Sequence, residues 1–133
     1  MPRFFRHRSG GISSDAGHGL GADFGSDTGI HMSEEYGVRS LHLGSSMVQS
    51  AMRLSKPNDL ELAYTQCMMC FTLFHPRPEN ILMIGLGGGS LTKFVCQRVP
   101  QVKATVIELN SQVVAAARRH FFVPIDDDRL QVL

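Results

Sequence analysis

The residues of this chain that could do chemistry gather around one glycine-rich segment. Gly85, Gly87 and Gly89 are spaced as G-x-G-x-G and directly follow the apolar run 81–84. Glycine is needed where a strand turns sharply into a helix and a ligand presses on the backbone. A second apolar run ends in Glu108 roughly 20 residues later, where an acidic side chain can accept hydrogen bonds from ribose hydroxyls. The pattern therefore indicates a site for an adenosine-type ligand.

The glycine spacing narrows the choice of ligand. The dinucleotide pattern G-x-G-x-x-G/A requires Gly or Ala at position 90, where this chain has Ser90. The spacing disfavours nicotinamide and flavin dinucleotides and suits ligands of the S-adenosylmethionine type, which have no pyrophosphate to hold. One alternative stays open: the glycines form only a tight strand-to-helix turn, and Glu108 caps the next helix.

The elements around this turn are those of a βαβαβ unit. Apolar runs predict strands at about 81–85, 103–108 and 130–133, and helical patterns lie between them at about 90–98 and 111–121. Right-handed crossovers place the three strands in the spatial order 3-2-1. The fold class expected is α/β, an incomplete class I methyltransferase-like Rossmann fold (βαβαβ) preceded by a small β-hairpin region.

The residues before this unit divide into three segments. Residues 1–32 are rich in Gly, Ser and His and predict a flexible tail, whereas 33–56 alternate as a β-hairpin region with a turn at 44–46. A helix should then start with Asn58 or Asp59 at its cap and end before Pro76. Residues 57–133 are expected to form the front half of an S-adenosylmethionine-type Rossmann domain.

Composition excludes several classes of partner. The chain has 133 residues, enough for at most one compact domain, and a formal net charge of +1. That charge gives no reason to expect nucleic acid or a membrane surface as partner. No apolar segment is long enough to span a bilayer, and no apolar segment of the secretory type follows the basic start. A cytoplasmic location is expected.

The three cysteines allow a metal or redox alternative. Cys67 and Cys70 form a C-x-x-C, and Cys96 stands alone. A zinc site would need two further ligands at matched spacing, and a thioredoxin-like motif should open a helix after a strand. This motif lies inside an apolar helical pattern, so we expect buried cysteines acting as small hydrophobic residues and no metal site.

Four segments carry a resemblance to a known family. They are Val48-Gln49 in the hairpin, Tyr64-Thr65-Gln66 in the helix, the glycine turn 85–90, and the strand end 106–109. From about Ser33 to Leu133 the chain resembles the N-terminal portion of the spermidine synthase (polyamine aminopropyltransferase) family. It is most similar to divergent, spermidine synthase-like members, because the typical signatures are altered.

The resemblance implies a transferase of polyamine biosynthesis. Its donor would be decarboxylated S-adenosylmethionine, bound as a co-substrate with no tightly held cofactor, and its acceptor a diamine such as putrescine. The amine would attack the aminopropyl carbon next to the sulfonium and release methylthioadenosine. A carboxylate must take the amine's proton. Members of the family commonly dimerise, so a homodimer is expected.

The resemblance also assigns roles to single residues. Gln49 would line the ligand cleft, although an ordinary polar strand residue is an equal alternative. Tyr64 would lie near the acceptor amine, with a core aromatic residue as its alternative. The donor would be bound by residues of the turn and the following strand end: Gly85, Gly87, Gly88, Gly89, Glu108 and Leu109, with Glu108 on the ribose and Leu109 beside the adenine.

Three departures from the family pattern bear on function. The family usually has Tyr-His-Glu where this chain has Tyr64-Thr65-Gln66, and Asp where it has Gly88. The catalytic aspartate is expected beyond Leu133, and the run 126–128 precedes the third strand and does not replace it. We therefore expect no aminopropyl transfer by this chain as written. An S-adenosylmethionine-dependent methyltransferase and a degenerate nucleoside-binding module remain alternatives.

Overall fold

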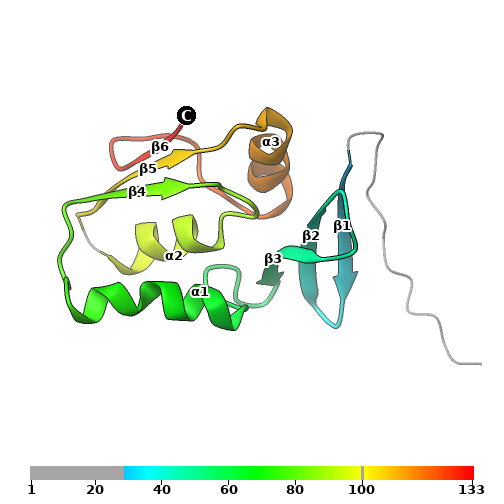
Figure 1. The fold of residues 1–133 in the computed structure, drawn as a ribbon, viewed down its shortest axis with the longest axis horizontal. Coiled ribbons are helices and arrows are strands. Elements are labelled where there is room, and N and C mark those ends of the chain that lie inside the picture. The colour runs from blue at the N-terminus through cyan, green and yellow to red at the C-terminus, as the bar shows by residue number, and fades with distance from the viewer. Residues whose placement is uncertain (1–28, 100) are drawn as a thin grey trace, which may run out of the picture.

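Two three-stranded sheets organise the described part of the molecule (Figure 1). The computed structural model describes residues 29–99 and 101–133. The first sheet consists of β1 (Ile30–Glu35), β2 (Val38–Leu43) and β3 (Val48–Arg53), and the second of β4 (Asn80–Ile84), β5 (Lys103–Ile107) and β6 (Leu130–Val132). The helices are α1 (Ala63–Met68), the 3₁₀ helix η1 (Met69–Leu73), α2 (Ser90–Arg98) and α3 (Ser111–His120).

The first sheet is antiparallel and larger than the predicted hairpin. Strands β2 and β3 pair as expected, with a register irregularity between Leu41 and His42. Strand β1, which was not predicted, pairs with β2 and begins at Ile30, inside the segment assigned to the tail. Ile30 and Met32 are buried in the sheet core, and this apolar alternation explains the strand. The rest of the predicted tail, 1–28, lies outside the described residues.

The second sheet confirms the predicted topology. Its strands are parallel in the order β4-β5-β6, so the strand that is first in the chain lies at one edge. Helices α2 and α3 form the two crossovers. Asn110 caps α3, because its side chain accepts a hydrogen bond from the amide of Gln112 at 3.0 Å.

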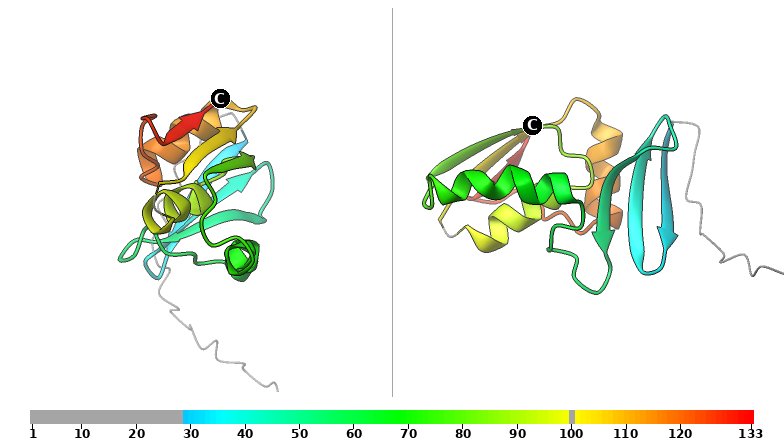
Figure 2. Two further views of the ribbon diagram at one scale, coloured as in Figure 1. Left: turned by 90° about the vertical axis from the view of Figure 1, so that its left-hand side faces the viewer. Right: turned by 60° about the horizontal axis from the view of Figure 1, so that its bottom comes forward.

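Helix α3 joins the two halves of the core. It lies between the parallel sheet and the small antiparallel sheet (Figures 1 and 2). Ala117 packs in the cluster formed with the parallel sheet and α2, whereas Val113 and Phe121 pack with residues of β1, β2 and β3. The two sheets are therefore held at a fixed separation by a shared helix, and the cleft between them is part of the folded structure.

Helix α1 begins later than its predicted start at residues 58–59. Its N-cap is Leu62, with no side-chain cap, because Asp59 instead lies in a turn and forms an ion pair with Arg98. The helix and the following 3₁₀ helix bury Thr65 and Met69, four residues apart on one face.

The expectation of buried cysteines in the C-x-x-C was wrong. Cys67 and Cys70 are exposed, because this segment buries Thr65 and Met69 instead, and Cys96 is half-buried. Within residues 29–99 and 101–133, no group of three or more His, Cys, Asp or Glu side chains could hold a metal ion. In the same part of the chain, no helix has the length and apolar character needed to cross a bilayer.

Candidate functional site

The glycine turn after β4 adopts a backbone that other residues rarely adopt. Gly85 has φ +87° and Gly87 has φ +54°, both in the left-handed region. The amide of Gly85 donates to the carbonyl of Ile107 on β5 at 2.7 Å, which fixes the start of the turn to the neighbouring strand end. Gly89, the N-cap of α2, has φ +68°, and a Cβ there would lie 2.2 Å from Cγ2 of Val123.

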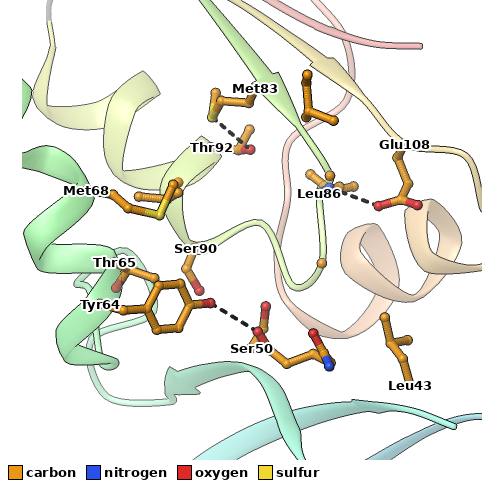
Figure 3. A pocket seen from close by; sticks show the side chains of 15 residues that line it. Leu43, Ser50, Tyr64, Thr65, Met68, Met83, Leu86, Ser90, Thr92 and Glu108 are labelled. Atoms are coloured by element: carbon orange, nitrogen blue, oxygen red, sulfur yellow. Dashed lines mark hydrogen bonds between the residues drawn. The ribbon is translucent and has the colours of Figure 1, made fainter.

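Glu108 lies beside this turn at the carboxyl end of β5. Its Oε2 accepts a hydrogen bond from the amide of Leu86 at 2.9 Å, and its Oε1 accepts one from the amide of Asn110 at 3.0 Å. The side chain is half-buried and faces the cavity (Figure 3). A carboxylate has about four acceptor positions. The two backbone bonds orient Glu108 and leave acceptor capacity for ligand hydroxyl groups.

Strand β3 of the small sheet forms the opposite side of the site. Ser50 is buried, and its Oγ accepts a hydrogen bond from the amide of Gly88 at 2.8 Å. The hydroxyl of Ser90 donates to the carbonyl of Ala51 at 3.4 Å. These two bonds fix the middle of β3 to the glycine turn and the beginning of α2, so that the small sheet and the glycine turn lie against each other.

Helix α1 closes a third side. The hydroxyl of Tyr64 donates to the backbone carbonyl of Gln49 at 3.2 Å, and Tyr64 is 53% exposed. The hydroxyl of the buried Thr65 donates to the carbonyl of Leu62 one turn earlier. Figure 3 shows Tyr64, Thr65 and Met68 facing the glycine turn from the side opposite Glu108.

Together these elements enclose a cavity of about 320 Å³, which is open to solvent on one side. Its lining comes from segments that are far apart in the chain (Figure 3). Strand β4 and the turn contribute Met83, Ile84, Gly85, Leu86 and Gly87. Helices α1 and α2 contribute Tyr64, Thr65, Met68, Ser90, Leu91 and Thr92. Leu43, Gln49, Ser50 and Glu108 complete it, and Glu108 is the one carboxylate among these lining residues.

The structure brings five of the eight predicted site residues to this cavity. They are Gln49, Tyr64, Gly85, Gly87 and Glu108. Gly88 and Gly89 are buried beneath the turn and do not line the cavity. Leu109 is 99% exposed and lies outside the lining as well.

Gly88 is packed more closely than the sequence suggested. A Cβ at this position would lie 2.9 Å from Cβ of Ser50 and 3.0 Å from Cδ1 of Phe121. Contacts this short require a neighbour to move, so the space that a side chain at position 88 would occupy is taken by β3 and the end of α3. The close packing around position 88 therefore leaves no room for an acidic side chain there.

Two residues near the site were missed by sequence reasoning. Ser50 contacts Gly88 across 38 positions of the chain, and no local pattern marks it. Lys93 on α2 is only 3% exposed, and burial lowers its pKa to about 8. A lysine within a short amphipathic helix ordinarily points to solvent, so its burial was not foreseeable from residue type.

Comparison with known proteins places the chain in a family. No family model matches the sequence. The chain is 42% identical over 104 residues to the polyamine aminopropyltransferase of Chromobacterium violaceum, an alignment of 78% of this chain and 40% of the relative. It is 40% identical over 105 residues to the enzyme of the same name from Neisseria meningitidis serogroup A, with the same coverage. The chain belongs to the spermidine synthase (polyamine aminopropyltransferase) family. It spans about 40% of the length of these relatives.

Solved structures of spermidine synthases share the fold. The spermidine synthase of Thermotoga maritima superposes with a TM-score of 0.59 and 24% identity, over 84% of this chain and 38% of that chain. A spermidine synthase in complex with the transition state analogue AdoDATO superposes with a TM-score of 0.62, at the same identity and coverage. The small antiparallel sheet followed by a Rossmann-like βαβαβ unit is thus a fold of this family.

Proposed function

We propose that this chain binds the adenosine part of an S-adenosyl sulfonium donor in the cavity between the glycine turn and the small sheet. The reaction served is the transfer of an aminopropyl group from decarboxylated S-adenosylmethionine to a diamine of the putrescine type. No residue of this chain is proposed as the base that takes the proton of the acceptor amine.

The position of Glu108 carries the proposal. It ends β5 next to a left-handed glycine turn, and it is the one carboxylate in the lining. Backbone amides orient it through one bond to each oxygen, and each oxygen keeps acceptor capacity at the edge of the cavity that Glu108 lines. A ribose diol needs two acceptors at such a position, at the carboxyl end of a parallel strand.

Membership of the family supports the choice of reaction. The relatives that the chain matches at 40% identity or more are polyamine aminopropyltransferases. A spermidine synthase of the same fold was solved with a transition state analogue bound. Tyr64 lies across the cavity from Glu108, and Gln49 lines the same cavity. These two residues would face the sulfonium and the acceptor side of the ligand.

Titration calorimetry with methylthioadenosine tests the nucleoside site. We expect the wild-type chain to bind this compound, and Glu108→Gln to weaken binding by about 1–3 kcal/mol because hydrogen bonds to a charged acceptor are lost. Glu35→Gln is the matched control, because it makes the same change on β1 outside the cavity. Equal affinities for the wild type and a folded Glu108→Gln variant would contradict the assignment.

Methyl transfer from intact S-adenosylmethionine is a second candidate, favoured by the packing at Gly88. An acidic side chain at position 88 would hold the terminal ammonium of a decarboxylated donor, but Ser50 and Phe121 occupy that space. An intact donor carries its own carboxylate beside the ammonium and needs no such acid. Tighter binding of S-adenosylmethionine than of its decarboxylated form would favour methyl transfer, and the reverse order would favour aminopropyl transfer.

A further inference from the structure

Lys93 is a buried cation that connects three separate segments. It lies in the first turns of α2, and its side chain is 3% exposed. Its Nζ donates to the carbonyl of Pro57 at 2.6 Å, to the carbonyl of Phe121 at 2.8 Å and to Sδ of Met52 at 3.0 Å. These partners lie in the loop after β3, at the C-cap of α3 and in β3 itself.

The number of donors matches the number of acceptors. An ammonium group carries three N–H donors and no acceptor, and three acceptors surround Nζ. A neutral amine has two donors and a lone pair, so it leaves one of the three acceptors without a hydrogen. The thioether sulfur is the weakest acceptor of the three, and its contact is the one that deprotonation removes first.

Two of these partners belong to segments that pack against the glycine turn. Met52 follows two residues after Ser50, which holds the amide of Gly88. The ring of Phe121 lies so close to Gly88 that a Cβ there would be 3.0 Å from Cδ1. Lys93 therefore fixes, at one point, both neighbours of Gly88 and so the β3 side of the cavity.

We propose that Lys93 is a positioning residue for the donor cavity: its ammonium holds β3 and the end of α3 against the glycine turn. In this role Lys93 does not contact the ligand and acts on it through Ser50. The inference rests on the proposed nucleoside site for its effect on binding, whereas its effect on the Gly88 contact is independent of any ligand.

Nearby charged groups do not supply the hydrogen bonds of Nζ. On β3, Arg53 is paired with Glu61. In the loop after β3 the charged residues are Lys56 and Asp59, and Asp59 is paired with Arg98. At the end of α3 the charged or titratable groups are Arg118, Arg119 and His120, and Arg118 is paired with Asp126. Burial is the cause of the lowered pKa of Lys93, with no charged neighbour contributing.

Hydrogen exchange of the Gly88 amide tests the proposal without ligand. Protection, corrected for the intrinsic dependence of exchange on pH, is measured from pH 6.5 to 9.5. In the wild type, exchange through local fluctuations that keep Lys93 buried should lose about three- to tenfold protection through one step near pH 8, as one hydrogen bond is lost. Global unfolding exposes Lys93 to water and becomes less favourable over the same pH range, so it does not produce this step. Lys93→Arg keeps its charge over this range, so its protection should show no step.

Met52→Leu is the second variant, because it removes the sulfur and leaves the lysine and the chain volume nearly unchanged. At pH 7 it should show the low Gly88 protection of the wild type at pH 9.5, with no further step. The proposal is overturned if Met52→Leu has the same Gly88 protection at pH 7 as the wild-type chain and still shows the step near pH 8. So would an unchanged step in a folded Lys93→Arg variant.

Affinity for methylthioadenosine, which has no group titrating between pH 7 and 9.5, supplies the functional readout. In the wild type the affinity should fall about three- to tenfold over the same step, and in Met52→Leu it should be low at both ends. A step in Gly88 protection with constant affinity would overturn the positioning role. A step in protection without any binding at either pH would retain the Gly88 part of the inference and refute the proposed function.

Discussion

The two sides of the cavity are built in different ways. The side formed by β4, the glycine turn and Glu108 depends on short-range chain geometry: φ angles that glycine permits and bonds between neighbouring strand ends. The side formed by β3 and α1 depends on packing between distant segments, through Ser50, Tyr64 and the buried Lys93. The first side should respond to substitution with loss of ligand recognition, and the second with loss of stability or of cavity shape.

The largest effect is expected at Gly87. Gly87→Val should weaken methylthioadenosine binding by about a hundredfold or more, because a branched side chain at φ +54° is strained and enters the cavity. A Cβ there would also lie 2.8 Å from Oγ of Ser50. Binding is measured by calorimetry. Gly37→Val is the control, because Gly37 also has a positive φ, +74°, but has open space around it. If Gly37→Val impairs binding equally, backbone strain alone explains the loss of binding in Gly87→Val.

Lys93 gives the next largest effect, on stability and its dependence on pH. The folded-state pKa is lowered from 10.5 to about 8, so above pH 8 the unfolded chain binds more protons than the folded chain at this residue. Stability contributed by Lys93 therefore rises between about pH 8 and 10.5, by up to roughly 3 kcal/mol, and its burial is unfavourable below pH 8.

Urea unfolding of the wild type and of Lys93→Met from pH 7 to 10.5 measures this effect. Other groups titrate in the same range, so the difference between the two proteins is the quantity compared. The wild type should gain stability relative to Lys93→Met as the pH rises. Parallel curves would mean that Lys93 keeps an ordinary pKa in the folded state.

Ser50→Ala should have a smaller effect on stability. It leaves the buried amide of Gly88 without an acceptor, at an expected cost of about 1–3 kcal/mol in the free energy of unfolding. Ser45→Ala removes a hydroxyl whose oxygen accepts a bond from Met47 at an exposed turn, and it should cost much less. Similar urea unfolding curves for the two variants would show that the Ser50 contact does not tie the two sides together.

Tyr64→Phe should have the smallest effect. The hydroxyl of Tyr64 donates to a backbone carbonyl at an exposed site, so its loss should change stability and methylthioadenosine affinity by about 0.5 kcal/mol or less. Tyr36→Phe, at a residue that is 99% exposed, is the matched control. A large loss of nucleoside affinity in Tyr64→Phe alone would move Tyr64 from the acceptor side of the proposed site to the donor side.

Features based on short-range geometry could be predicted from the sequence. The strand order, the glycine turn, the cap of α3 and the position of Glu108 follow from periodicity and residue type within about 20–30 residues. Strand β1 was missed although Ile30 and Met32 alternate, because the glycine- and serine-rich residues before it dominated the interpretation of that segment.

Features that depend on long-range packing could not be predicted. The bond from Gly88 to Ser50 and the three bonds of Lys93 join residues 28 to 41 positions apart. Nothing local to Lys93 shows that two carbonyls and a sulfur will meet its ammonium. The exposure of Cys67 and Cys70 was missed for the same reason, because the face of α1 that is buried is decided by what packs against it.

The contact beneath Gly89 has a consequence for how this sequence can evolve. A methyl group at position 89 would fall 2.2 Å from Cγ2 of Val123, and the φ of +68° disfavours any side chain there. A lineage could replace Gly89 only after residue 123 had become smaller, and the backbone penalty would persist even then. Two substitutions in a fixed order are thus required where most surface positions need one, and drift at this site should be correspondingly slow.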